Sequence, residues 1–575
     1  MNPREPYETE IGHSRDGAPH RVGLERVRRQ DVIAGHISRL VPAALLLAAS
    51  SLGQSTPASN GLPVTYQRLL HAPQEPANWL TYGGDYRSHH YSSLSQITAD
   101  NVQRLRVKWI YQVHRPKVET TPIVVDGIMY FTRPPSDVVA LDAETGRALW
   151  TFEYRLSTRV YTCCGEVNRG LAILGTTLYV TTLDAKLIAL DARSGRVLWQ
   201  QDIADPALNY TATAAPLAVK DKIIAGIAGA DGGIRGFLDA YDAKTGERAW
   251  RFWTVPAPGE PGSETWGGHS WRHGGASTWV TGSFDPELNL LYWGTGNPGP
   301  DFNGDVRPGD NLYSCSLLAL DPDTGKLKWH FQFTPHDTHD WDANQVPVLL
   351  DSTLGGRLRK LVVVPNRNGF YYVLDRQSGE FLLAKPYVKQ TWAKEIDKKG
   401  RPVLIPGQEP TLEGNESIWP GVLGANNWMS PSYNPITRLL YFNAREERRR
   451  YFKTDAPEFH PGESYFGGGG GGGTRFRPEE SWGKLIAMTP ETGETQWEHR
   501  ILSPPWAGVL STAGNLVFSA TPSGNFYALD ARTGKELWHF NGGGRAHAGP
   551  ISFLSRGKQI VSIAIGDLLI AFELP

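Results

Sequence analysis

Short apolar runs separated by turn residues recur along most of this chain. One such run, residues 138–141, is followed by Asp142, by Thr145-Gly146 and then by Trp150, giving the phrase A-L-D-x-x-T-G-x-x-x-W. An Asp side chain can accept hydrogen bonds from nearby backbone N–H groups, and glycine supplies a positive φ. The phrase therefore predicts a short strand, a tight turn and a second strand that begins near the tryptophan.

The phrase is repeated, and each copy follows a further apolar run. Copies occupy residues 189–199, 240–250, 319–329 and 528–538, with weaker ones at 489–497 and 375–379. Upstream runs such as 128–131 and 177–180 also suit strands, so each unit contains about four short strands, the size of a propeller blade. One twisted blade cannot bury both faces alone, and a flat tryptophan is suited to fill the seam between neighbours.

The units can be counted from their starting points. Seven begin near Glu119, Arg169, Thr213, Ser277, Asn344, Trp428 and Trp506. An eighth is split: residues 550–574 supply most of its strands, and residues 105–111, with Trp109 in the repeat position, supply the remaining one. Such closure protects the sheet edges. We therefore expect an all-β, eight-bladed β-propeller with tryptophan-docking repeats, closed by an N-terminal strand; an open all-β solenoid would not need the displaced strand.

The N-terminal region differs from the repeats. Five arginines between positions 21 and 39 precede an apolar run at 40–49 and then small residues, which is the pattern of a signal peptide. The run is too short to span a bilayer comfortably. We expect a signal peptide and flanking disordered segment over residues 1–58 and the propeller over 59–575, with an uncleaved anchor or a disordered tail as the alternative.

Charge and cysteine content exclude several classes. Lys+Arg number 58 against 59 Asp+Glu, so no basic excess points to nucleic acid. Three cysteines cannot provide a disulfide framework, and no C-x-x-C-H motif is present to attach a c-type haem. The glycine run at 467–473 is interpreted as a flexible surface loop.

The adjacent pair Cys163-Cys164 is the sharpest local anomaly. A disulfide between neighbours closes a tiny ring and adds little loop-closure stabilisation, so its use would be a rigid surface beside something flat. Two unpaired thiols in a buried strand are the alternative that the dipeptide alone favours.

The surroundings of this pair carry a resemblance. The block C-C-G-x-V-N-R-G at 163–170 is accompanied by G-T-G-N-P at 294–298, R-P-G-D-N at 307–311 and T-P-H-D at 334–337. With these blocks, the chain from Trp79 onward resembles the alcohol dehydrogenases that depend on pyrroloquinoline quinone (PQQ), among them methanol dehydrogenase large subunits. The resemblance implies PQQ on the propeller axis, between a tryptophan ring and a vicinal disulfide, with a metal ion against its quinone.

The resemblance also implies a set of cofactor contacts. They are Glu119, Cys163, Cys164, Arg169, Thr213, Gly229, Ala230, Ser277, Trp279, Arg367, Asn427 and Trp506. Trp279 matches the ring under the cofactor, Arg169 matches an arginine that pairs with a PQQ carboxylate, and Arg367 matches the cation near the quinone oxygens. Charge-assisted pairing is what a tricarboxylate cofactor requires. Without the resemblance, each of these residues would more often be structural.

A second set matches the metal ligands and the catalytic base. The ligands implied are Asp231, Asn297, Asp340 and Asp342, and the family usually has Glu where this chain has Asp231. Asp340 matches the catalytic carboxylate. Asp342 lies two residues on, so both carboxylates point the same way in an extended segment. A second Asp here resembles the lanthanide-using members, although a loop carboxylate paired with a nearby cation is the alternative.

The implied function is oxidation of a small alcohol in the periplasm. Hydride would pass to the C5 carbonyl of PQQ, Ca²⁺ or a lanthanide would polarise that carbonyl, and Asp340 would take the alcohol proton. Electrons would leave through a separate cytochrome c or other acceptor. Two alternatives are a non-catalytic propeller scaffold of the outer-membrane-assembly kind, which needs neither Cys163-Cys164 nor Asp340, and a sugar or polyol dehydrogenase of the same architecture.

Overall fold

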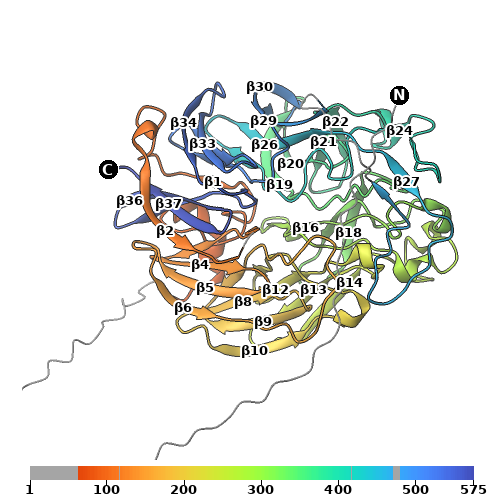
Figure 1. Cartoon of the computed structure of the whole chain (residues 1–575), viewed down its shortest axis with the longest axis horizontal. Coiled ribbons are helices and arrows are strands. Elements are labelled where there is room, and N and C mark those ends of the chain that lie inside the picture. Colours follow the sequence, from red (N-terminus) through yellow and green to blue (C-terminus); the bar gives the residue numbers. More distant parts are fainter. Residues whose placement is uncertain (1–61, 116, 416, 471–479) are drawn as a thin grey trace, which may run out of the picture. The chain divides into compact units, whose positions relative to one another are not determined.

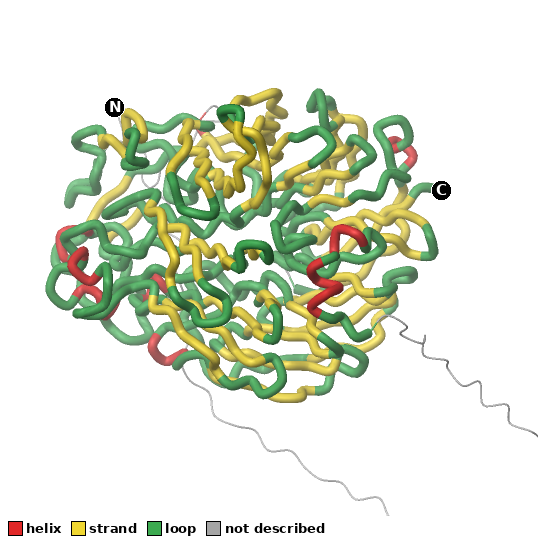
Figure 2. Tube along the Cα trace, turned by 180° about the vertical axis from the view of Figure 1, so that it is seen from behind, coloured by secondary structure: helices red, strands yellow, loops and turns green. Residues whose placement is uncertain are grey.

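Eight β-sheets follow one another around a central axis (Figure 1). The computed structural model describes residues 62–115, 117–415, 417–470 and 480–575. Strands and loops dominate these residues, and their helices are short (Figure 2). The predicted eight-bladed, all-β propeller is confirmed. The expected signal peptide and its flanking segment, residues 1–58, lie outside the described residues.

The blades are numbered here in chain order. Blade 1 contains β3 (Ile123–Val125), β4 (Ile128–Arg133), β5 (Asp137–Asp142) and β6 (Ala148–Phe152); blade 2 contains β7 (Ala172–Leu174), β8 (Thr177–Thr181), β9 (Lys186–Asp191) and β10 (Val197–Asp202). Blade 3 contains β11 (Leu217–Val219), β12 (Lys222–Gly226), β13 (Phe237–Asp242) and β14 (Arg248–Trp253); blade 4 contains β15 (Ser283–Asp285), β16 (Leu290–Gly294), β17 (Ser316–Leu320) and β18 (Leu327–Gln332).

The second half of the ring repeats this plan. Blade 5 contains β19 (Val348–Leu354), β20 (Arg357–Pro365), β21 (Phe370–Asp375) and β22 (Phe381–Pro386); blade 6 contains β25 (Ser432–Asn434), β26 (Leu439–Glu447), β29 (Ser481–Thr489) and β30 (Glu494–Ile501). Blade 7 contains β31 (Leu510–Thr512), β32 (Leu516–Ala520), β33 (Asn525–Asp530) and β34 (Glu536–Asn541); blade 8 contains β35 (Ile551–Ser555), β36 (Lys558–Ile565), β37 (Leu568–Glu573) and β2 (Arg106–Gln112).

The remaining elements are short and lie outside the four-strand plan. The strands are β1 (Tyr91–Ser92), β23 (Ala393–Ile396), β24 (Pro402–Leu404), β27 (Tyr451–Lys453) and β28 (Gly468–Gly470). The helices are α1 (Tyr66–Leu70), η1 (Ala72–Gln74), η2 (Val102–Arg104), η3 (Pro206–Leu208), η4 (Ala230–Gly232), η5 (Ser263–Thr265), η6 (Ser270–His273) and η7 (Gly304–Val306). None of the described helices is long and apolar enough to cross a membrane.

The repeated phrase forms the outer hairpin of a blade. In blade 1, Ala140 at the start of the phrase pairs with Trp150 at its end, and a bulge follows at Leu141. The turn between them is held by Asp142, whose Oδ1 accepts hydrogen bonds from the backbone N–H of Glu144 (3.0 Å) and of Thr145 (2.8 Å). The strand–turn–strand reading of the phrase is confirmed, and the bulge turns the outer strand so that its tryptophan faces the next blade.

The seam between blades is a contact between tryptophan and glycine. A Cβ added to Gly195 in the turn of blade 2 would lie 2.5 Å from Cε3 of Trp150 in blade 1, so only glycine lets the indole cover this turn. Trp150 also donates from Nε1 to the carbonyl oxygen of Ala192 at 3.2 Å. The same indole-on-glycine contact joins Trp109 to Gly146, Trp199 to Gly246, Trp250 to Gly325, Trp329 to Gly379 and Trp497 to Gly534.

The ring is closed by the N-terminal strand, as expected. β2 pairs antiparallel with β37, placing Trp109 opposite Ala571, and Trp109 then covers Gly146 of blade 1. A second N-terminal segment, β1, pairs in parallel with β31 and adds a fifth strand to blade 7. Both N-terminal strands are therefore incorporated into the last two blades.

The glycine run in blade 6 differs from the expectation. Its described part includes β28, which pairs antiparallel with β27 and places Gly469 opposite Phe452. The prediction of a flexible loop is therefore wrong for Gly468–Gly470, and residues 471–473 of the run lie outside the described residues. Phe452 and Lys453 lie so close that a Cβ at Gly468 would fall 2.2 Å from the carbonyl oxygen of Phe452, so the packing requires glycine there.

The burial of the strands shows how the blades are oriented. The first strand of a blade is buried, as in β3 and β7, whereas the fourth is largely exposed, as in β6 and β10. The first strands therefore lie next to the axis. The segments that lead into them converge there, which places the starting residues of different blades around one central cavity.

Candidate active site

The cavity at the axis is built from three kinds of segment. Blade-entry segments contribute Arg169, Thr213, Ser277, Trp279 and Trp428, and loops after the second strands contribute Leu183, Ala228, Gly229, Asp231, Asn297 and Arg367. Connections between blades contribute Tyr161, Thr162, Cys163, Cys164, Gly165, Val167, Asp340, Asp342, Leu423 and Asn427, and Thr211 completes the lining. Its volume is about 860 Å³, open solvent at the mouth included. Residues from blades 2 to 6 and from the connections between blades 1 and 2, 4 and 5, and 5 and 6 thus meet in one place.

A vicinal disulfide forms part of the cavity wall. Cys163 and Cys164 are bonded to each other, which confirms the disulfide and excludes the reading as two buried free thiols. Both residues are exposed at the cavity, and Cys315 is the free, buried cysteine. Lys117 donates from Nζ to the carbonyl oxygen of Cys164 and so anchors the loop that carries the disulfide.

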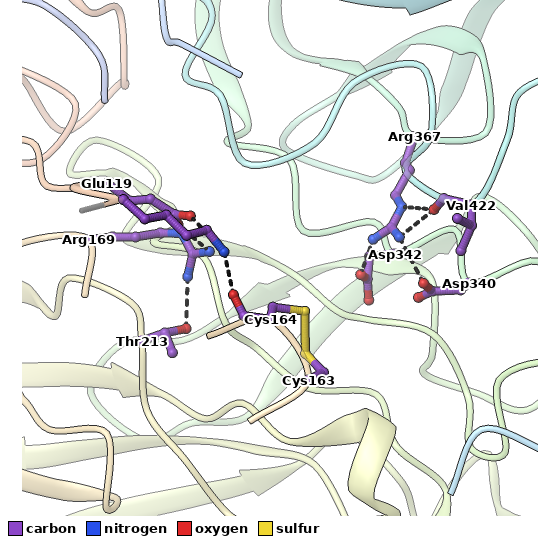
Figure 3. Close-up of a disulfide and its surroundings, with 10 residues drawn as sticks. Glu119, Cys163, Cys164, Arg169, Thr213, Asp340, Asp342, Arg367 and Val422 are labelled. Atoms are coloured by element: carbon purple, nitrogen blue, oxygen red, sulfur yellow. Dashed lines mark hydrogen bonds and ion pairs between the residues drawn. A yellow bond between two sulfur atoms is a disulfide. The ribbon is translucent and has the colours of Figure 1, made fainter. Parts of the chain in front are cut away.

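The first charged cluster surrounds Arg169. Its Nη2 lies 2.8 Å from Oε2 of Glu119, and its Nη1 donates to Oγ1 of Thr213 at 2.8 Å (Figure 3). The guanidinium carbon lies 4.7 Å from the ring centroid of Trp279 and 5.2 Å from that of Trp428. Arg169 is 4% exposed, so a cation is held in place between two aromatic faces and a buried carboxylate.

The second charged cluster surrounds Arg367, and Figure 3 shows the two clusters on either side of the disulfide. Arg367 donates from Nη2 to Oδ2 of Asp340 at 2.9 Å and from Nη1 to Oδ2 of Asp342. The other oxygen of Asp342 accepts the backbone N–H of Asn297 at 2.8 Å. Arg367 also donates to the carbonyl oxygen of Val422, which fixes the direction of its guanidinium.

Three carboxylates approach one another beside Arg367. Oxygens of Asp231, Asp301 and Asp340 all lie within 4.8 Å of one another. Asp301 is fully buried, and its Oδ1 accepts a hydrogen bond from Nδ2 of Asn297 at 2.8 Å. Like charges at this separation in a buried site repel strongly, so the arrangement favours a bound cation.

The pKa values of these groups also reflect burial and the repulsion between neighbouring carboxylates. Burial raises the pKa of Asp231 to about 6, and the charge of Asp342 adds to the shift. Burial also raises the pKa of Asp340 well above its usual range; Arg367 opposes this shift, while Asp342 and Asp231 reinforce it. Burial lowers the pKa of Arg367, but the charges of Asp340 and Asp342 outweigh it and the net shift is upward.

The backbone of Asp340 is also unusual. Its φ is +59°, in the left-handed region that non-glycine residues rarely occupy. Such a conformation costs about 1–3 kcal/mol and persists only where the surroundings hold it. Asp337 contributes to that hold, because its Oδ2 accepts the backbone N–H of Trp341 at 2.9 Å. The result is a carboxylate turned into the cavity from a fixed loop.

Most of the residues implied by the resemblance line this cavity, and three do not. Glu119 lies behind Arg169 with its side chain 1% exposed. Ala230 is buried in η4 next to Asp231. Trp506 stacks on Trp428 with ring centroids 4.6 Å apart, and Arg445 covers Trp506 at 3.9 Å. These residues support the wall from outside the cavity.

Two residues that sequence reasoning did not assign to the site belong beside it. Trp428 begins blade 6 at the position equivalent to Arg169 and Thr213 in their own blades, and that equivalence was the available signal. Asp301 follows Asn297 by four positions in a loop without a repeat, so only the folded structure brings its carboxylate to Asp231 and Asp340.

The donors fit the two groups that the resemblance implies. The cluster of carboxylates with the amide of Asn297 offers hard oxygen ligands, which suit Ca²⁺ or a trivalent lanthanide ion rather than a soft metal. Trp279 and the disulfide offer flat surfaces in the same cavity, and Arg169 offers a cation to an anionic, planar cofactor.

Comparisons with known proteins agree with this site. The family model described as "Glucose/ethanol/alcohol dehydrogenase, beta-propeller domain" matches residues 79–390, and one described as "Outer membrane protein assembly factor BamB" matches residues 481–573. The chain is 38% identical over 556 residues to quinoprotein alcohol dehydrogenase PedH of Pseudomonas putida, an alignment that covers 92% of each chain.

Two solved structures share both fold and sequence with this chain. The quinohemoprotein alcohol dehydrogenase of Comamonas testosteroni is 35% identical with a TM-score of 0.82, and the match covers 88% of this chain and 84% of that one. A europium-containing methanol dehydrogenase is 32% identical with a TM-score of 0.82, and the match covers 88% of this chain and 100% of that one.

The fold and the site together define a quinoprotein dehydrogenase of the propeller type. The chain belongs to the glucose/ethanol/alcohol dehydrogenase β-propeller family. It is a PQQ-dependent oxidoreductase that acts on alcohols. A non-catalytic scaffold is therefore set aside.

Proposed function

We propose that this enzyme oxidises a small alcohol in the periplasm, with Asp340 as the general base and a metal ion beside it. The observation that carries the proposal is the position of Asp340. Its carboxylate lies in the same cavity as Trp279 and the disulfide, and it is paired with Arg367 at 2.9 Å. When bound there, PQQ would supply a quinone able to accept hydride, and a metal ion held by the neighbouring carboxylates would supply Lewis acidity.

The cofactor would be held by the residues around Arg169. The guanidinium of Arg169 would pair with a carboxylate of the cofactor, and Thr213 and Ser277 would offer hydroxyl groups from neighbouring blade-entry segments. Trp279 and the disulfide, which line the same cavity, would cover the ring system and exclude water from it. Because these groups belong to different blades, the rigid ring of blades keeps them in register.

Asp340 would remove the proton of the alcohol hydroxyl. A base must be ionised before it can accept a proton, and the pKa of Asp340 is raised by burial in the protein alone. Arg367 and a cation at the carboxylate cluster both favour the ionised form. Arg367 thus has two roles, since it orients Asp340 through Nη2 and holds its negative charge.

The metal ion would be Ca²⁺ or a lanthanide, bound by Asp231, Asn297, Asp340 and Asp342. A trivalent ion is favoured by the number of carboxylates, since each additional charge strengthens binding of a more highly charged ion. The likeness to a europium-containing methanol dehydrogenase supports the same choice. Asp342 already binds Arg367 and the N–H of Asn297, but its oxygens retain further lone pairs for an ion.

Electrons would leave to a separate acceptor such as a cytochrome c. The chain has no C-x-x-C-H motif for its own haem, whereas several relatives are named quinohemoproteins. The apolar segment at residues 40–49 after basic residues supports export.

The test is reconstitution of the full chain with PQQ and either La³⁺ or Ca²⁺. We expect a quinone absorption band, one bound metal ion per chain by mass spectrometry, and dye-linked oxidation of short alcohols that is faster with La³⁺. A panel that includes sugars and polyols separates the two substrate classes. Failure to bind PQQ, or equal activity with Ca²⁺ together with no effect of Asp342→Ala under La³⁺, would overturn the cofactor or the metal assignment respectively.

A further inference from the structure

Asp301 is a buried carboxylate with an oxygen that no protein group satisfies. The residue is 0% exposed, and its Oδ2 has no hydrogen-bond partner among the residues that the structure describes. Leaving a buried carboxylate oxygen without a partner costs free energy that a folded protein normally avoids. Oδ2 of Asp301 therefore needs a partner that none of the described residues provides.

Arg307, which donates to the backbone carbonyl of Asp301, does not provide a partner for this oxygen. Arg307 is also fully buried, but its donors go to the carbonyl oxygens of Pro300, Asp301 and Asp337 and to the amide oxygen of Asn311. No ion pair between Arg307 and the Asp301 side chain is found in the described part of the chain. The cation that would satisfy Asp301 has to come from elsewhere.

The other oxygen of Asp301 already points the residue toward the metal site. Its Oδ1 accepts Nδ2 of Asn297 at 2.8 Å, and a carboxylate oxygen of Asp301 lies within 4.8 Å of oxygens of Asp231 and Asp340. An ion that contacts Asp231 and Asp340 would therefore lie close to Asp301 as well.

We infer that Asp301 is a further ligand of the metal ion, binding through Oδ2 while Oδ1 holds the amide of Asn297. This inference rests on the proposed function, in which a cation binds beside Asp340. With Asp301, the proposed site has four carboxylates and one guanidinium, that of Arg367, which pairs with Asp340 and Asp342; their formal charges sum to −3. That charge matches a trivalent ion, so Asp301 is expected to increase the preference for La³⁺ over Ca²⁺.

The first experiment compares metal binding by the PQQ-loaded, full-length wild-type protein with Asp301→Asn. Asparagine keeps an acceptor for Asn297 but removes the charge. We expect La³⁺ affinity, from chelator competition with metal measured by mass spectrometry, to fall at least about tenfold and Ca²⁺ affinity to fall less. Asp305→Asn is the matched control, because Asp305 is exposed, pairs with Lys453 and lies outside the cavity.

Affinity alone would not separate a ligand from a residue that only positions Asn297. Eu³⁺ luminescence lifetimes in H₂O and D₂O count the waters bound to the ion, and we expect Asp301→Asn to admit an additional water. Unchanged La³⁺ affinity, or weaker binding with an unchanged water count, would overturn the inference and leave Asp301 as a positioning residue.

A measurement on the unmodified protein covers the case in which the variant fails to fold. In a crystal structure of the protein loaded with PQQ and La³⁺, Oδ2 of Asp301 should lie about 2.3–2.6 Å from the ion, as hard oxygen ligands do. A distance beyond about 4 Å would sink the inference. If Asp231→Asn abolishes La³⁺ binding and Asp301→Asn does not, only the role of Asp301 fails; if the wild-type protein binds neither ion, the proposed metal site itself fails.

Discussion

Arg367 donates from Nη2 to Oδ2 of Asp340 at 2.9 Å, and this pair lies at the junction of the cofactor cavity and the carboxylate cluster. The arginine follows β20 in blade 5, whereas Asp340 belongs to the connection between blades 4 and 5. Arg367 also binds Asp342, so it holds both acidic side chains of the D-x-D segment in one orientation. The proposed base is therefore positioned by a neighbour rather than by its own loop alone.

Replacement of this base tests the chemistry directly. We expect Asp340→Asn to lower kcat at least about 100-fold, because a positioned general base contributes roughly 10²–10⁴. Asparagine can still bond to Arg367, so the fold and the quinone absorption should remain. Dye-linked turnover, absorption and metal content should be measured on the same reconstituted sample, with Asp305→Asn as the control. Near wild-type turnover in the metal-loaded asparagine variant would contradict the role of base.

The pair of Arg169 and Glu119 allows cofactor binding to be separated from stability. Arg169→Gln removes the cation over Trp279 and takes from Glu119 the partner that lies 2.8 Å away, which leaves the Nζ of Lys117, 3.7 Å from Oε1, as the cation beside this carboxylate. We expect PQQ affinity to fall at least about tenfold, from the loss of a charge-assisted bond, and the free energy of unfolding to fall by about 1–3 kcal/mol.

The double variant decides between these two effects. Adding Glu119→Gln to Arg169→Gln removes the buried charge that has lost its nearer partner, so it should recover much of the stability but not the PQQ affinity. PQQ titration followed by absorption and denaturant unfolding measure the two quantities. Full recovery of PQQ affinity in the double variant would show that Arg169 serves the fold and not the cofactor.

The seams between blades make a further prediction about glycine. Gly195 and Gly175 both lie in turns of blade 2 with φ near +70°, at +69° and +66°, but only Gly195 faces a tryptophan. Gly175→Ala should cost about 1–2 kcal/mol from backbone strain alone. Gly195→Ala should cost about 1–3 kcal/mol more, because its Cβ would lie 2.5 Å from Trp150. If denaturant unfolding showed the same loss of unfolding free energy in both variants, the indole of Trp150 would have to move aside without cost.

The blade architecture could be predicted because each repeat carries its own local chemistry. Asp142 closes its turn through its own neighbours, and Trp150 meets a glycine that belongs to the equivalent turn of the next unit. The split eighth blade followed from a single displaced tryptophan, Trp109, which does pair with Ala571. The regular repeats were therefore sufficient to predict the fold, the number of blades and the way the ring closes.

The parts that were missed depend on contacts without a repeat. Asp301 becomes a neighbour of Asp231 and Asp340 only because loops from different parts of the ring converge at the axis. The glycine run gave a wrong expectation for β28, because composition indicates flexibility while the pairing with β27 is a tertiary contact. Residues matched to the known family, such as Arg367, were placed in the cavity because the motif already contains this three-dimensional information.

A buried histidine that does not line the central cavity predicts how stability depends on pH. His90 is 0% exposed, its Nε2 bonds to the carbonyl oxygen of Pro550 at 2.9 Å, and its ring packs against Trp79 with centroids 5.0 Å apart. Burial lowers the pKa of His90 from 6.5 to about 4, while Pro550 and Asp85 oppose the shift. The folded protein therefore keeps this imidazole neutral where the unfolded chain would protonate it.

The sign of the effect follows from proton binding. As the pH falls from 6.5 to about 4, the unfolded chain takes up a proton at His90 and the folded protein does not, so stability is lost across this window. The full loss amounts to about 3 kcal/mol at 1.36 kcal/mol per pKa unit. In His90→Gln, glutamine can still donate to Pro550 but cannot titrate. We expect the variant to have a lower free energy of unfolding than the wild type at pH 7. Denaturant unfolding should show this difference disappearing by pH 4.5. Because the carboxylates titrate alike in both proteins, a gap that stays constant between these pH values would rule out His90 as the source.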